Sequence, residues 1–172
     1  MQTLTHLAIG ALVGTIVAPN DRTLQIASAA GAIAPDILLV PKFCYDKFRG
    51  RQPFAHQSKG TVLFIQILNS IPLWLAVGMI SSIIMSNWAQ WAHPYFFMNA
   101  LIHLFIDQLT HSGKEFEKTD PGGLWPLPMR LNIGIWEYRY AHGVLKLKPF
   151  ELAILISSVI VVVILQLLVP TK

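Results

Sequence analysis

The sequence predicts an all-α integral membrane protein, a bundle of about five membrane-embedded helices. Hydrophobic residues make up 53% of the 172-residue chain and charged residues only 13%, about half of the roughly 25% that is usual in soluble domains. The apolar residues are also gathered into long stretches that polar, basic segments separate. A bilayer removes the need for a charged surface, and helices of ~20 apolar residues span its hydrocarbon core. The length suits a single domain, residues 1–172.

Five apolar stretches are the expected helices, in the order Thr3–Ala18, Thr23–Val40, Thr61–Met85, Pro94–Thr110 and Leu152–Val169. The third and fifth have the length of a full span. The other three are shorter or carry polar residues, as expected for tilted, re-entrant or buried helices. Residues 60–106 contain no Asp, Glu, Lys or Arg, which is too long for one helix and fits two. The break falls near Trp88 and Trp91, which suit a membrane–water interface. In the first stretch, Gly10 and Gly14 predict a close helix contact.

The basic residues set the predicted orientation. Five of the 13 Lys and Arg residues lie between the second and third stretches, and six lie between the fourth and fifth: Lys42, Lys47, Arg49, Arg51 and Lys59, then Lys114, Lys118, Arg130, Arg139, Lys146 and Lys148. Five spans place both segments on one side, which the positive-inside rule makes cytoplasmic. We therefore expect a multi-pass inner membrane protein with a cytoplasmic N-terminus. Residues 112–150 would form a cytoplasmic or interfacial loop.

The fourth stretch carries ionisable residues at helical spacing. His103, Asp107, His111 and Glu115 recur every four residues, which returns the chain to nearly the same helix face. Imidazole and carboxylate are ligand types of zinc, whereas the single cysteine, Cys44, gives no zinc-finger spacing. An unpaired charge inside a membrane costs a few kcal/mol or more, so Asp107 needs a partner. The stripe predicts a metal site, and a simple hydrogen-bonded pair of His103 and Asp107 is the alternative.

Three further residues fall at the same predicted membrane face. Asp36 follows Pro35, which is expected to break the second stretch just before its cytoplasmic end. On its own, Asp36 would suit an N-cap for residues 37–40. His6 opens the first stretch and His56 lies in the basic loop after the second; singly, they suit an interfacial and a solvated residue. Together with the fourth stretch, these residues indicate one polar cluster at the cytoplasmic ends of the helices.

Five short motifs follow one another along residues 3–130: Thr5-His6-Leu7, Ala34-Pro35-Asp36, Phe54-Ala55-His56-Gln57-Ser58, His103-Leu104-Phe105-Ile106-Asp107 and Leu124-Trp125-Pro126. In order and spacing, they resemble the YdjM-type family of predicted membrane-bound metal-dependent hydrolases. That family is related to zinc-dependent phospholipase C and the P1-type nucleases.

The resemblance implies a helical zinc site for phosphodiester hydrolysis. In the related soluble enzymes an Asp, a loop His and a helical His-x-x-x-Asp pair form one metal site. Carried over, this set is Asp36, His56, His103 and Asp107. An early histidine shares the helical Asp with another metal, which suggests His6, and His111 would supply part of a further position. The chain has Arg51-Gln52 where the family often has His-Arg, and it lacks the N-terminal ligand of the processed enzymes. One or two ions, zinc or another divalent metal, are therefore expected.

The leading hypothesis is a zinc-dependent hydrolase that acts on a phospholipid or another lipid-linked phosphate at the inner membrane face. Asp107 would bridge the metals, Asp36 is the other candidate catalytic carboxylate, and Arg49 and Lys59 would attract an anionic head group. Membrane lipids are the expected partners, and nucleic acid is not expected. One alternative is a non-catalytic protein whose cluster is a structural metal site or a polar network. A proton or metal-ion transporter ranks lower, because the ionisable residues form no path across the membrane.

Overall fold

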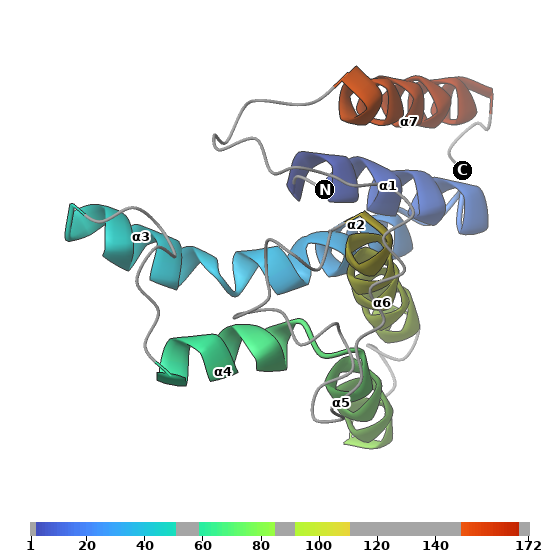
Figure 1. Ribbon diagram of the computed structural model, residues 1–172. Coiled ribbons are helices and arrows are strands. Elements are labelled where there is room, and N and C mark those ends of the chain that lie inside the picture. Colours follow the sequence, from blue (N-terminus) through green and yellow to red (C-terminus); the bar gives the residue numbers. More distant parts are fainter. Residues whose placement is uncertain (1–2, 51–58, 85–91, 111–148, 169–172) are drawn as a thin grey trace.

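A computed structural model of the chain describes residues 3–50, 59–84, 92–110 and 149–168. Within these ranges all regular structure is helical, as the sequence predicts. Figure 1 shows α1, α2 and α7 lying across the molecule, with α4, α5 and α6 on the other side of α2 from α1. The helices are α1 (Thr3–Val17), α2 (Arg22–Ile37), α3 (Val40–Phe48), α4 (Lys59–Leu68), α5 (Ile71–Ile84), α6 (Ala92–Thr110) and α7 (Pro149–Leu168).

Helices α1 and α2 run antiparallel and pack backbone to backbone. A Cβ atom added to Gly10 would lie 2.4 Å from the Cβ atom of Ala32, and one added to Gly14 would lie 2.8 Å from the Cα atom of Gln25. The hydroxyl group of Ser28 donates a hydrogen bond of 2.7 Å to the carbonyl oxygen of Gly10. The close helix contact predicted from the two glycines is confirmed, and it lies within the chain. It brings the start of α1 beside the end of α2.

Pro35 lies inside α2, so the predicted break at this proline is in the wrong place. Its side chain is fully buried. Helical hydrogen bonding continues beyond it, since the amide of Leu38 donates to the carbonyl of Ala34 at 3.2 Å. Helix α2 ends at Ile37, and the chain bends by 41° before α3 begins at Val40. An interior proline removes one helical hydrogen bond and favours a kink, and here the buried packing of the proline carries the helix on to Ile37.

The third apolar stretch forms two helices, so the prediction of one continuous helix over Thr61–Met85 is wrong. Helix α4 ends at Leu68 and α5 begins at Ile71. The hydroxyl group of Ser70 accepts a hydrogen bond of 3.1 Å from the amide of Leu73, and Pro72 occupies the first turn of α5. A serine N-cap followed by a proline in the first turn is a strong start signal for a helix. Uninterrupted hydropathy across residues 61–85 masks that signal.

The described part of helix α6, Ala92–Thr110, contacts α2 at Gly31. A Cβ atom on Gly31 would lie 2.0 Å from the carbonyl oxygen of Phe96, so the two backbones touch. A buried cluster of Trp74, Ala100 and Leu104 joins α5 to α6 beside this contact. The contact fixes where the last turns of α6 lie relative to the end of α2.

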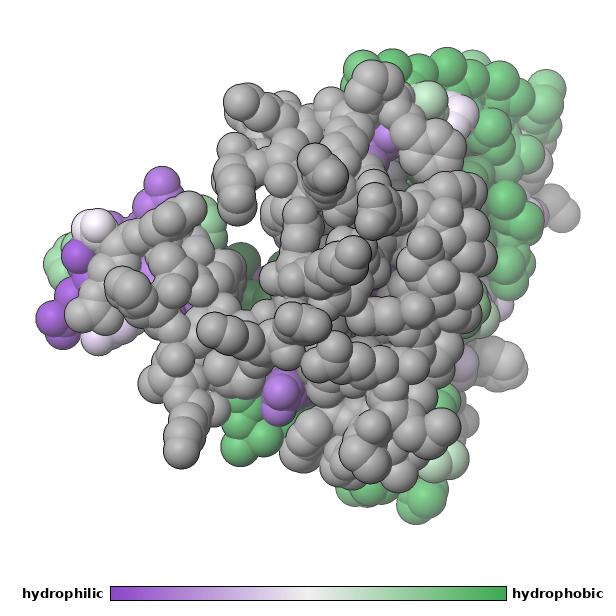
Figure 2. All heavy atoms as spheres, in the orientation of Figure 1, coloured by the Kyte–Doolittle hydropathy of each residue, from purple (hydrophilic) through white to green (hydrophobic). Residues whose placement is uncertain are grey.

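Helix α7 is, among the described residues, the one helix long and apolar enough to cross a membrane by itself; the bent pair α2 and α3 adds a second if the two form one broken span. Its described residues include Pro149 and Phe150, which precede the predicted start at Leu152; the rest of the predicted loop, residues 112–148, lies outside the described residues. Figure 2 shows hydrophobic side chains over α7 and hydrophilic ones over α3. Five spans and a cytoplasmic N-terminus stay predictions.

Candidate metal centre

Three helix ends converge on one polar cluster. His6 lies in the second turn of α1, Asp36 lies in the last turn of α2, and His103 and Asp107 lie in the last two turns of α6. The spacing of four residues puts His103 and Asp107 on one helix face, as predicted. The backbone contacts of α2 with α1 and with α6 bring the other two residues to that face. The structure therefore joins residues that lie up to 101 positions apart in the sequence.

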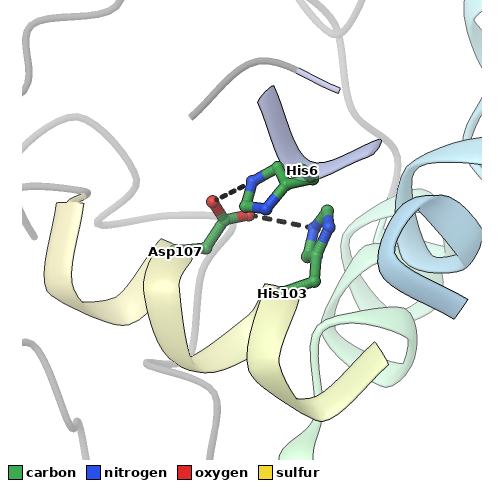
Figure 3. Close-up of side chains that lie close together, drawn as sticks. All are labelled: His6, His103 and Asp107. Atoms are coloured by element: carbon green, nitrogen blue, oxygen red, sulfur yellow. Dashed lines mark hydrogen bonds and ion pairs between the residues drawn. The ribbon is translucent and has the colours of Figure 1, made fainter. Parts of the chain in front are cut away.

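Asp107 lies beside the two imidazole rings and contacts both (Figure 3). Its Oδ1 atom lies 3.0 Å from Nε2 of His6, and its Oδ2 atom lies 3.2 Å from Nε2 of His103. The two rings stack, with centroids 3.8 Å apart and an interplanar angle of 28°. Both imidazoles are buried, whereas the carboxylate keeps 19% of its side chain exposed. The carboxylate thus faces two imidazole nitrogens on one side and is partly exposed on the other.

A backbone contact fixes the orientation of the His103 ring. Its Nδ1 atom lies 2.6 Å from the carbonyl oxygen of Ala32, an acceptor that only an N–H group can satisfy. In the neutral ring, the lone pair then lies on Nε2 and points at acceptors: Asp107 at 3.2 Å and Asp36 Oδ1 at 3.7 Å. Nε2 is buried and has no hydrogen bond of acceptable geometry. A lone pair and carboxylate oxygens that face one another are stable only with a cation between them, a proton or a metal ion.

Asp36 belongs to this cluster and does not cap the next helix. The N-cap of α3 is Leu39, which makes no side-chain capping bond, so the N-cap interpretation of Asp36 is wrong. Its Oδ2 atom accepts a hydrogen bond of 2.6 Å from the hydroxyl group of Thr3. The side chain is 27% exposed. Asp36 therefore lies at the open edge of the cluster, held in place by the first turn of α1.

The donor set fits a divalent metal ion. His6, His103 and Asp107 each offer one ligand atom, and these atoms all lie within 4.8 Å of one another. Two atoms that are each ~2.1 Å from one tetrahedral ion lie ~3.4 Å apart, which falls within the 4.8 Å that bounds these ligand atoms. Zinc-bound histidines commonly donate their other N–H group to a backbone carbonyl, as His103 does to Ala32. Two imidazoles and a carboxylate form a three-ligand set of the kind that leaves a fourth position open.

The structure brings together four of the six predicted ligands, His6, Asp36, His103 and Asp107. The other two, His56 and His111, lie outside the described residues, as does Glu115. Sequence reasoning missed Thr3 and the carbonyl of Ala32, whose roles depend on how the helices pack. The threonine had one usable signal, since Thr3 lies one turn before His6 on the same helix.

A third buried histidine lies apart from this cluster. His93, at the start of α6, contacts the hydroxyl group of Ser81 on α5 and packs against Phe97 with its ring tilted, the centroids 4.5 Å apart. His93 and His103 lie ten residues apart along α6, about 15 Å of helix rise. The pair joins α5 to α6 and contributes no ligand to the metal cluster.

Comparison with known proteins identifies a family over almost the whole chain. The family model described as YdjM inner membrane protein matches residues 1–170. The chain therefore belongs to the YdjM inner membrane protein family, in agreement with the resemblance of its motifs. No curated protein and no solved structure shows significant similarity to it.

Proposed function

We propose that this member of an inner membrane family is a metal-dependent hydrolase of a phosphoester, carried by a lipid and presented at the membrane surface. One observation carries the proposal: Nε2 of the buried His103, whose ring the carbonyl of Ala32 orients, faces the carboxylates of Asp107 and Asp36. This geometry calls for a cation, either a proton on the ring or a metal ion between the ligands. The motif resemblance, which points to zinc-dependent phosphodiesterases, supports zinc and the type of reaction.

Each residue has a distinct task in this proposal. His6 and His103 supply neutral nitrogen ligands from rings that packing holds rigid, and Asp107 supplies the oxygen ligand between them. A zinc ion bound there would supply Lewis-acid polarisation of the phosphoester and a lowered pKa for a coordinated water. Asp36, part exposed and oriented by Thr3, is placed to accept a proton at the open edge or to add a further ligand.

The substrate class follows from where the cluster lies. A site at helix ends in an inner membrane protein is accessible to molecules that diffuse in the membrane plane and carry their phosphate at the surface. A phospholipid or another lipid-linked phosphate has that form. The basic loop residues support a cytoplasmic site under the positive-inside rule, and the inner leaflet is then the proposed source of substrate.

The test compares two aspartate-to-asparagine variants of the purified, detergent-solubilised protein. Asp107→Asn removes the shared ligand, whereas Asp21→Asn changes an exposed N-cap whose Oδ1 atom accepts from the amide of Leu24 at 3.1 Å. Asparagine caps a helix as well as aspartate does, so Asp21→Asn is a matched control. We expect the wild type and the control to bind zinc and hydrolyse a fluorogenic phosphodiester or phospholipid, and Asp107→Asn to lose both. A folded wild-type protein that takes up no divalent metal would refute the proposal.

A non-catalytic cluster is the second candidate, because His6 and Asp107 already form a hydrogen bond of 3.0 Å without any metal. In that case the cluster is a polar network or a closed structural site that joins α1 to α6. Structural zinc sites use four protein ligands, whereas catalytic sites keep one position for water or substrate. X-ray absorption spectroscopy of the zinc-loaded protein separates the two. Three protein ligands plus a light oxygen ligand favour the hydrolase, and four protein ligands favour the structural site.

A further inference from the structure

Helix α3 projects from the rest of the molecule. Figure 1 shows it extending beyond the end of α2, and no other described helix packs along it. The 41° bend after α2 turns it away from the axis of that helix. A helix of nine residues is too short to be stable by itself in water. We therefore expect the exposed side of α3 to have a partner.

One side of this segment is apolar and exposed. Tyr45 is half exposed, and Phe48 at the end of α3 is 91% exposed. They are spaced three residues apart within α3, which keeps them on one side of the helix. An isolated phenylalanine on a surface is ordinary, but an exposed tyrosine beside an exposed phenylalanine suits a membrane–water interface, where aromatic rings gather.

Two of the four charged residues in Val40–Arg49 are basic, exposed and able to bind a partner. Lys42 forms an ion pair with the buried Asp46 one turn later, so these two charges neutralise each other. Lys47 and Arg49 remain, both exposed. The guanidinium group of Arg49 lies over the Tyr45 ring, 5.4 Å from its centroid. Basic side chains beside exposed aromatic rings match the head-group layer of an anionic leaflet, in which cations meet lipid phosphates and rings meet the upper acyl chains.

We infer that α3 lies in the head-group layer of an anionic membrane leaflet, with Tyr45 and Phe48 inserted and Lys47 and Arg49 on the lipid phosphates. The bend before α3 follows directly on the turn that carries Asp36. Docking α3 on the surface therefore sets the end of α2, and the metal centre with it, at the height of the lipid phosphates. The inference rests on membership of a membrane family and does not depend on whether the centre hydrolyses a phosphoester.

The native cysteine provides the probe. Cys44 is the only cysteine of the chain, is exposed, and lies on α3 next to Tyr45. A nitroxide spin label on Cys44 reports depth from its collisions with oxygen, which concentrates in the bilayer, and with a water-soluble nickel chelate. In full-length protein reconstituted in vesicles of phosphatidylglycerol and phosphatidylcholine, we expect oxygen to dominate. A label at Val163, half exposed on α7, introduced as Val163→Cys in a Cys44→Ala background, calibrates the acyl-chain region.

Two charge variants distinguish docking on lipid from contact with a second copy of the chain. Each basic residue near an anionic surface is worth ~1 kcal/mol, about fivefold. The double variant Lys47→Gln/Arg49→Gln should lower the ratio of docked to undocked label by about 30-fold, as should vesicles of phosphatidylcholine alone. The control Lys42→Gln/Asp46→Asn removes one charge of each sign and should leave the ratio unchanged. A label that stays accessible to nickel in anionic vesicles overturns the inference. So does docking that ignores the charge variants, or dipolar broadening between labels, which would show that a second copy covers α3.

Discussion

The substitution Gly31→Ala tests the contact between α2 and α6 that orients the candidate metal centre. Gly31 of α2 faces α6, and a Cβ atom there would lie 2.0 Å from the carbonyl oxygen of Phe96. Non-bonded heavy atoms settle ~3.5 Å apart, so Gly31→Ala must separate the two helices by roughly 1.5 Å. Overpacking of this kind costs about 1–3 kcal/mol. The gain in helix propensity from glycine to alanine, about 1 kcal/mol, offsets only part of it.

The same displacement reaches the metal centre through the next residue. The carbonyl of Ala32 lies 2.6 Å from Nδ1 of His103, and an opening of roughly 1.5 Å lengthens that contact to ~4 Å, beyond hydrogen-bonding range. The ring is then free to rotate away from Asp107. Loss of such an orienting partner weakens metal binding about 10–100-fold. Gly31→Ala should therefore lower both the free energy of unfolding and the affinity for zinc, although it changes no ligand.

The assay has two readouts and an internal control. Thermal unfolding followed by circular dichroism in detergent reports stability, and competition with a chromophoric chelator reports zinc affinity. Gly78→Ala is the control, because its Cβ atom would meet the Phe97 ring at 3.2 Å, where a side chain can yield; it should be neutral or slightly stabilising. A Gly31→Ala protein that melts with the wild type and binds zinc as tightly would refute the account of helix packing and ring orientation.

Three further predictions concern the same framework. Zinc at a hundredfold excess over its Kd should stabilise the wild type by about 2.7 kcal/mol, and His6→Ala should abolish that gain in a melting experiment with and without chelator. Ser28→Ala removes the buried hydrogen bond to Gly10 and should cost about 1–3 kcal/mol, measured by chemical denaturation; an unchanged midpoint would show that water replaces the hydroxyl group. Ser70→Ala removes the N-cap bond to Leu73 and should cost about 1 kcal/mol, whereas Ser70→Thr, which keeps a hydroxyl group at this buried position, should retain most of that stability; equal losses in the two variants would contradict a capping role.

Local patterns predicted part of the helical structure and half of the candidate centre. The extent of α1, to within one residue at its end, follows from hydropathy, and the common face of His103 and Asp107 follows from the spacing of four residues. The break at Ser70 was missed because both flanking segments are apolar, and only the capping serine and Pro72 mark it. The helix through Pro35 was missed because the rule for prolines is local, whereas the burial of this ring is not.

The rest of the centre depends on contacts between helices. The place of His6 and Asp36 beside α6 requires the glycine contacts of α1 with α2 and of α2 with α6, which no single segment encodes. The acceptor for His103 is a backbone carbonyl, a group that every residue carries, so its identity as Ala32 follows from packing alone. The prediction that His6 and Asp36 join His103 and Asp107 came from the membrane side inferred from the basic residues and from the order and spacing of the motifs, compared with a known family.

The order of synthesis gives the pairing of His6 with Asp107 a temporal consequence. The two residues are 101 positions apart, so at about 5–20 residues per second His6 leaves the ribosome roughly 5–20 s before its partner. Helices α1 and α2 can form their glycine-mediated hairpin in that interval, with the hydroxyl group of Thr3 able to bond Asp36. The nascent chain thus holds two of the four residues of the cluster while α4 and α5 emerge. The cluster is complete only when α6 follows, so the contact of the Asp107 carboxylate with His6 joins α6 to α1 late in biosynthesis.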